Sequence, residues 1–150
     1  MERREALVGM IVLAVAGVAQ GQAGVAADKA SGSFVGGSRV FKLSDAARTK
    51  AANGSERLSG FHGTLATGEV VGMHESWTPA GVAPPALHRI MHTELIALLE
   101  GEVEFVHDGK TEHAVAGDVI FVDYGTTHYV KNVGSGTARY MVFAVGGDAR

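Results

Sequence analysis

From residue 56 onward, short runs rich in apolar and β-branched residues alternate with breaks that contain glycine. Many short strands at regular spacing with glycine turns indicate an all-β sandwich or barrel. The Asp108-Gly109 break favours a two-residue hairpin between neighbouring strands. No long helical period and no internal repeat appear in this part of the chain. The predicted strands span residues 61–66, 70–77, 94–99, 103–106, 111–115, 119–122, 129–132 and 139–145.

The segment 28–55 is predicted to be a lead-in to a single barrel domain that covers residues 56–150. Its residues 40–43, Val-Phe-Lys-Leu, predict a short first strand. Ser44-Asp45 is a helix-capping pair, so a short helix is predicted to run through Lys50. Asn53-Gly54 then predicts a tight turn into the barrel.

Residues 1–27 have the order of charged, apolar and small residues that is typical of a cleavable signal peptide. The apolar stretch runs only from Ala6 to about Ala19, which is short for a membrane span. The adjacent Arg3 and Arg4 resemble a twin-arginine export signal. We therefore expect an exported protein, periplasmic or extracellular, that contacts a membrane only through an uncleaved signal segment.

Composition narrows the chemistry that the chain can perform. The net charge is −3 and the sequence shows no dense basic patch, so nucleic acid is not an expected partner. The chain has no cysteine, which excludes disulfides and thiolate chemistry. A transition metal would therefore be held by histidine, carboxylate or water, which makes the seven histidines the residues to explain.

A first cluster of candidate ligands consists of His88, His92 and Glu94. All three positions are even-numbered, and alternate residues of an extended chain share one face. Two imidazoles and a carboxylate suit a divalent transition metal such as Mn, Fe, Ni, Cu or Zn. A second cluster lies between Gly117 and Asn132, where the strand after a glycine turn opens with His128 and places a third imidazole on a neighbouring strand.

The second cluster resembles the second motif of the cupin family. That motif reads Gly, five residues, Pro-x-Gly, two residues, His, three residues, Asn. Gly117, Gly125, His128 and Asn132 match it in full spacing, and Asp123 replaces the proline.

The first cluster resembles the family's first motif, which reads Gly, a short spacer, His-x-His, three or four residues, Glu, six residues, Gly. His88, Glu94 and Gly101 match this spacing. The resemblance covers roughly residues 60–145 of the chain. It implies a single antiparallel jelly-roll β-barrel, often dimeric, with the metal inside and with His88, Glu94 and His128 at ligand positions.

One departure from the family pattern is that Ile90 stands where the second histidine is expected. His92 has the same parity as Ile90 and is a candidate replacement. The site is therefore His88, Glu94 and His128, or that set with His92, or a degraded site without metal. We take His88, His92, Glu94 and His128 as the candidate ligands of one divalent transition metal.

Two functions follow from this pattern. The first is a metal-dependent enzyme of oxygenase, isomerase or lyase type, an oxidoreductase or dioxygenase in its narrowest form, that acts on a small organic molecule. The alternative is a non-catalytic cupin that binds a sugar or an apolar ligand beside a degraded site. Of the other histidines, His62, His107 and His113 are expected at the surface. His74 is expected to be a hydrogen-bonded structural residue, and the alternative is that it points inward near the pocket.

Overall fold

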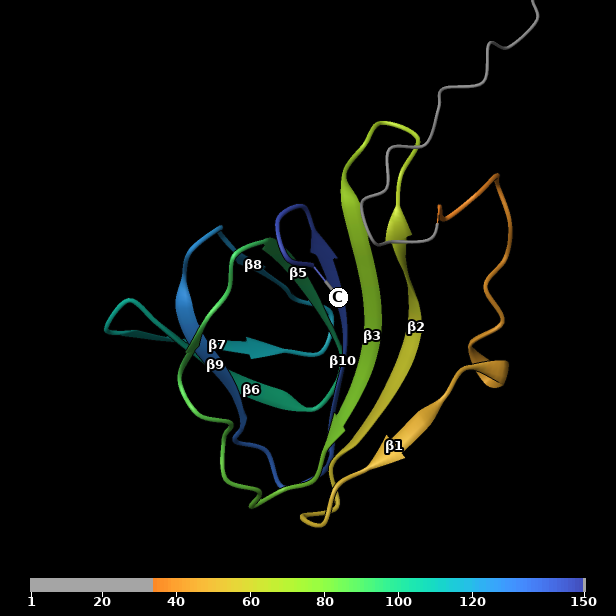
Figure 1. The fold of residues 1–150 in the computed structure, drawn as a ribbon. Helices are drawn as coiled ribbons and strands as arrows, with labels where there is room; N and C mark the ends of the chain where they lie inside the picture. Colours follow the sequence, from red (N-terminus) through yellow and green to blue (C-terminus); the bar gives the residue numbers. More distant parts are fainter. Residues whose placement is uncertain (1–33, 150) are drawn as a thin grey trace, which may run out of the picture. The chain divides into compact units, whose positions relative to one another are not determined.

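The computed structural model describes residues 34–149. The predicted signal peptide, residues 1–27, lies outside the described residues. The described chain folds into two sheets in which every strand pair is antiparallel. Figure 1 shows the two sheets facing each other, which confirms the predicted all-β jelly-roll barrel.

The six-stranded sheet and the four-stranded sheet each mix strands from distant parts of the sequence, as a jelly-roll requires. The six-stranded sheet has the order β1 (Arg48–Lys50), β2 (Glu56–Thr64), β3 (Val70–Thr78), β10 (Ala138–Val145), β5 (Thr93–Glu100) and β8 (Val119–Val122). The four-stranded sheet has the order β4 (His88–Arg89), β9 (Thr127–Asn132), β6 (Glu102–His107) and β7 (Lys110–Val115). Each of the eight predicted strands overlaps an observed one.

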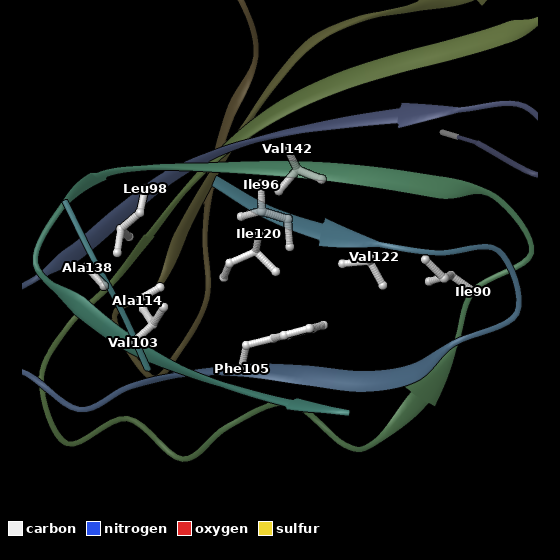
Figure 2. Close-up of a cluster of buried hydrophobic side chains, with 10 residues drawn as sticks. All are labelled: Ile90, Ile96, Leu98, Val103, Phe105, Ala114, Ile120, Val122, Ala138 and Val142. Atoms are coloured by element: carbon white, nitrogen blue, oxygen red, sulfur yellow. The ribbon is translucent and has the colours of Figure 1, made fainter. Parts of the chain in front are cut away.

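The core lies between the sheets and follows from the period-two pattern of the strands. On β5, Ile96 and Leu98 are buried while Leu95 and Leu99 are exposed. On β8, Val122 is fully buried at 0 % exposure. Figure 2 shows how the inward residues of both sheets meet. The cluster consists of Ile90, Ile96, Leu98, Val103, Phe105, Ala114, Ile120, Val122, Ala138 and Val142.

Two predicted turns are confirmed by their backbone geometry. Asp108 and Gly109 both have positive φ, 46° and 73°, and connect β6 to β7 as the favoured two-residue hairpin. Gly101 joins β5 to β6 at φ 81°, where a Cβ atom would lie only 2.9 Å from the carbonyl oxygen of Thr137. A glycine at this motif position therefore serves the close packing of the barrel corner.

The predictions for residues 40–50 were wrong. Residues 40–43 form no strand, and a single 3-10 turn, Leu43–Asp45, replaces the predicted helix. The side chain of Ser44 bonds to Asp45 and caps no backbone group. The chain instead enters β1, where Arg48 pairs with Leu58 of β2, so sheet pairing outweighs the local helix signal. Within residues 34–149, no helix is long and apolar enough to cross a membrane.

Candidate functional site

The two sheets enclose a cavity of about 600 Å³ whose lining is rich in ionisable side chains. It receives residues from β2, β3, β5 and β10 of one sheet and from β4 and β9 of the other. All four candidate ligands line it. The full lining is Arg57, His74, Ser76, Pro85, His88, Arg89, Ile90, His92, Glu94, Ile96, His128, Val130, Tyr140, Val142 and Asp148.

Glu94 is the central acceptor of the cavity, and an imidazole faces each of its two oxygens. His92 Nε2 lies 2.9 Å from Glu94 Oε1, which is a hydrogen bond. His128 Nε2 lies 3.6 Å from Glu94 Oε2, slightly beyond hydrogen-bond distance. Glu94 reaches this position because inward positions of β5 alternate, so it shares a face with Ile96 and Leu98.

The charges of this cluster depend on one another. Burial alone raises the pKa of Glu94, but the adjacent imidazoles of His128 and His92 outweigh burial and lower it. Burial alone lowers the pKa of His92, but its hydrogen bonds with Asp148 and Glu94 outweigh burial and raise it. The carboxylates therefore favour the charged form of His92, and the imidazoles favour the ionised form of Glu94.

Asp148 is a site residue that the sequence analysis missed. Its Oδ1 lies 2.7 Å from His92 Nδ1, on the opposite side of the ring from Glu94. Gly146 and Gly147, with φ of 76° and 50°, turn the chain after β10 back toward Met91, whose carbonyl oxygen accepts a bond from the Asp148 amide at 3.2 Å. The glycine pair after a predicted strand signalled a turn, but not which residue the turn delivers to the cavity.

His88 and His128 come together through strand pairing, because they are opposite each other in the β4–β9 register. Their ring centroids are 4.8 Å apart. His88 Nδ1 lies 3.1 Å from the carbonyl oxygen of Ala86 and donates a hydrogen bond to it. His128 is 2 % exposed, and its Nδ1 is buried without a hydrogen-bond partner within the described chain.

Within residues 34–149, no group of three or more histidine, aspartate or glutamate side chains is arranged to hold a metal ion as it stands. The donor chemistry nevertheless fits a divalent transition metal. The Nδ1 atoms of His88 and His92 are turned to a carbonyl and a carboxylate, the outer contacts that metal-binding histidines usually make. His92 and Glu94, which share a hydrogen bond, carry the kinds of donor atom that would hold such a metal.

Ile90 lines the cavity but has no donor atom that could replace the imidazole expected at that position. It is 5 % exposed and lies at one end of the hydrophobic cluster, as Figure 2 shows. The segment around it is also not continuously extended. The Ile90 amide bonds to the carbonyl of Thr126, the chain bends at Met91 and His92, and β5 begins at Thr93. His88, His92 and Glu94 still line one cavity, as their shared parity predicted.

The predicted roles of the remaining histidines are partly confirmed. His62 and His113 are exposed, as expected, and His62 Nε2 contacts the carbonyl oxygen of Ala149 at 3.0 Å. His107 is half-buried and stacks on Phe105 rather than lying freely at the surface. His74 is hydrogen-bonded, as expected, but it also lines the cavity, where Arg57 Nη2 lies 3.2 Å from its Nδ1.

We predict that His74 stays neutral across the physiological pH range. Burial, followed by the positive charge of Arg57, lowers the pKa of His74 to about 4. The unfolded chain takes up a proton at this residue near its usual value of about 6.5. Because only the unfolded state gains that proton between pH 6.5 and 4, His74 makes folding less favourable as the pH falls through this window.

An NMR titration of the His74 ring measures this directly. The ring signals are expected to stay constant from about pH 8 down to about pH 5. In Arg57→Gln the pKa is expected to rise, since a nearby cation is removed. A midpoint near pH 6.5 in the unaltered protein would contradict the prediction.

Asn132, the last residue of the second motif, has a structural role. It is 6 % exposed, and its Nδ2 donates to the carbonyl oxygens of Thr78 and Gly136, both at 2.8 Å. Its Oδ1 accepts from the Gly134 amide at 2.9 Å. These bonds tie the end of β9 to the end of β3 and hold the following turn.

Two antiparallel sheets around a cavity that carries a histidine and glutamate cluster define a small jelly-roll barrel. Residues 73–144 match the family model described as a cupin domain. The chain therefore belongs to the cupin superfamily. No curated protein matches the sequence.

Solved structures with the same fold have low sequence identity. A RmlC-like cupin from Shewanella frigidimarina aligns over 74 % of this chain and 94 % of its own, at 19 % identity and a TM-score of 0.60. KdgF from Halomonas sp. aligns over 75 % and 97 %, at 15 % identity and a TM-score of 0.60. A predicted oxalate decarboxylase from Thermotoga maritima aligns over 71 % and 98 %, at 23 % identity and a TM-score of 0.55. At these identities the likeness shows the fold alone.

Proposed function

We propose that this cupin is a metal-dependent enzyme that acts on a small organic molecule in the barrel cavity. One observation carries the proposal: imidazole nitrogens of His92 and His128 face the two oxygens of the half-buried Glu94. His88, His92, Glu94 and His128 would hold one divalent transition metal. Bound there, the metal would supply Lewis-acid or dioxygen-activating chemistry.

The cavity lets side chains of this protein handle substrate protons. His92 bridges Glu94 and Asp148, which make its neutral ring more basic, so the neutral ring is suited to accept a proton from a bound molecule when it does not hold the metal. Ile90, Val130 and Val142 add apolar surface that excludes water from one side of the cavity. The volume of about 600 Å³ fits a small organic substrate.

The fold does not determine the reaction type. Oxygenases, isomerases and lyases are all compatible with this donor set, and structural neighbours include a predicted oxalate decarboxylase and KdgF. Within this range we favour an oxidoreductase for a small organic acid or phenol. Oxygen consumption by the Fe-, Mn- or Cu-loaded protein, measured with a panel of such compounds, tests this choice. Consumption no faster than that of Glu94→Gln would oppose it.

Calorimetric metal titration tests the site itself and separates the three sets of ligands. His92→Gln is expected to weaken metal binding strongly if His92 replaces the histidine missing at Ile90. If His92→Gln weakens metal binding only slightly, the ligands are His88, Glu94 and His128. His113→Gln is the matched control, since His113 is exposed, does not line the cavity and bonds to Glu102. Binding unaffected by both His92→Gln and His128→Gln would overturn the proposed site.

A second function is a binding module that holds a sugar or an apolar ligand and catalyses nothing. The observation that favours it is Ile90, which fills the position of a family histidine and packs in the core. This alternative predicts that a small molecule binds equally well to the metal-free and metal-treated protein.

We further propose that the protein is a homodimer formed through the outer face of β5 and β8. Leu95, Leu99, Val119 and Phe121 are 42 %, 43 %, 62 % and 60 % exposed there. Leu95 and Phe121 are opposite each other in the strand register, so these side chains form one apolar patch. A patch of this kind on a rigid sheet suits a two-fold contact with a second copy of the same chain.

The oligomeric state is measured by size-exclusion chromatography with light scattering. The unaltered protein is expected to have the mass of a dimer, and Phe121→Glu the mass of a monomer, because the buried charges would be unpaired. Val40→Glu, at a residue 77 % exposed and away from these strands, is the control and is expected to stay dimeric. A monomeric unaltered protein would refute the dimer.

We propose that residues 1–27 export the protein by the twin-arginine route. Replacing Arg3 and Arg4 with lysine is expected to leave the protein in the cytoplasm, because that route requires the arginine pair. Cell fractionation measures the outcome. Continued export of the double variant would point to an ordinary secretory signal, and cytoplasmic retention of the unaltered chain would refute export.

A further inference from the structure

Two arginines line the cavity and have no acidic partner among residues 34–149. Arg57 on β2 contacts the neutral His74, and Arg89 on β4 donates from Nε to the carbonyl oxygen of Gly125 at 2.8 Å. Of the other arginines among residues 34–149, Arg48 binds Glu56 at 2.7 Å, Arg139 binds Glu75, and the exposed Arg39 bonds to the carbonyl of Val35. Two of the three guanidinium groups without an acidic partner therefore line the cavity.

The charged groups of the cavity differ in how they are paired. Its two carboxylates, Glu94 and Asp148, are both committed to His92. Arg57 and Arg89 then add positive charge that no carboxylate of the described chain neutralises. A cavity with this balance favours an anionic ligand.

Arg57 is the better placed of the two arginines to bind that anion. Its Nε and one of its terminal nitrogens remain available, since only Nη2 contacts His74. It also lines a second cavity of about 510 Å³, which shares Ser76, Pro85, Val130 and Tyr140 with the first. Arg57 thus stands at the junction of the two cavities, whereas Arg89 is tied to the turn at Gly125.

The walls near Arg57 suit an organic body attached to the anionic group. Val130 and Tyr140 are common to both cavities, and Ile90 and Val142 line the first. A guanidinium group holds a carboxylate through two parallel hydrogen bonds and so fixes its orientation. The neutral His74 on the other side of Arg57 limits the rotation of the guanidinium group without cancelling its charge.

We infer that Arg57 binds the carboxylate of a small organic acid and orients its remaining part toward the Glu94 cluster. The inference deepens the proposed function, on which it rests, by naming the substrate class. Arg57 is a binding residue in this account and takes no part in bond breaking.

Calorimetry with the full-length, chelator-treated protein tests the inference, since a carboxylate cannot then be held by a metal. The probes are acetate, benzoate and phenylacetate, each compared with its primary amide. At least one acid is expected to bind, and its amide to bind at least about tenfold more weakly. Arg57→Gln is expected to weaken binding of that acid roughly 10- to 100-fold and to leave the amide unaffected.

Two further variants test whether acid binding depends on the paired hydrogen bonds of Arg57 and whether loss of an arginine elsewhere has the same effect. Arg57→Lys keeps the charge but loses the paired hydrogen bonds, so intermediate binding is expected. Arg39→Gln removes an exposed arginine outside the cavity and is expected to bind the acid normally. Unchanged circular dichroism and melting temperature confirm that the Arg57 variants are folded.

The inference is overturned if none of the acids binds, if each acid binds no better than its amide, or if Arg57→Gln binds the acid normally. Metal titration of the same preparations distinguishes failure of the acid site from failure of the proposed metal-dependent function. Acid binding that depends on Arg57, in a protein that takes up no metal, would refute the metal enzyme and leave the acid site. Metal uptake without such acid binding would refute the acid site alone.

Discussion

Replacing Glu94 with glutamine is expected to weaken metal binding by about 100-fold or more, because an amide oxygen is a poor transition-metal ligand and carries no charge. Glutamine has nearly the shape of glutamate, so the substitution leaves no cavity in the barrel. Glu94 is also the group that the imidazoles of His92 and His128 both face. Its loss removes the shared contact, and equilibrium dialysis with Zn or Mn measures the result.

The control for this substitution lies on the same strand. Glu100 is exposed at the end of β5 and does not line the cavity, so Glu100→Gln is expected to bind metal normally. A Glu94→Gln protein that is folded and retains the metal would exclude Glu94 as a ligand. Glu94 accepts a hydrogen bond from His92, so the substitution could disturb the local structure. The circular dichroism of Glu94→Gln is therefore compared with that of the unaltered protein.

Leu98→Ala is expected to destabilise the barrel by about 2–5 kcal/mol. Leu98 is 2 % exposed and belongs to the hydrophobic cluster between the sheets, which Figure 2 shows. Removing its side chain loses buried apolar surface and leaves a cavity that a closed barrel cannot easily fill. Urea denaturation measures the change in the free energy of unfolding.

Leu99→Ala provides a matched comparison with the neighbouring residue of the same type. Leu99 is 43 % exposed on the outer face of β5, so its loss is expected to change the free energy of unfolding of the barrel far less. Since Leu99 belongs to the proposed dimer patch, both variants are compared at one protein concentration. Equal destabilisation by the two substitutions would contradict the assigned inward and outward faces of β5.

Much of the fold could be predicted because local patterns and sheet pairing agree. On β5 and β8 the apolar residues are dense, the turns carry glycine, and the observed ranges differ little from those predicted. The two-residue β4 was missed because His88–Arg89 is too short for any periodic signal. It exists through its pairing with β9, which no local pattern reveals.

The N-terminal part of the described chain shows where local signals mislead. Ser44 and Asp45 are suited to cap a helix, but β1 forms instead at Arg48–Lys50. There Arg48 and Lys50 both pair with Glu56, and Arg48 lies over the ring of Trp77 at 4.0 Å. These contacts involve residues that are distant in sequence, so helix propensity alone gave the wrong prediction.

The candidate site was also predicted only in part from the sequence. Motif spacing and parity identified His88, His92, Glu94 and His128, and all four line one cavity. Asp148 and Arg57 belong to no motif. They reach the cavity through a turn after β10 and through the position of β2 in the sheet, which depend on tertiary structure.

The cavity is proposed to hold a divalent transition metal. Elemental mass spectrometry of the protein, purified without a histidine tag or chelator, tests this most directly, with His128→Ala measured in parallel. The expected result is about one equivalent of Mn, Fe, Ni, Cu or Zn, which is lost in the variant. A folded protein that contains no metal, or the same metal content in His128→Ala, would contradict it.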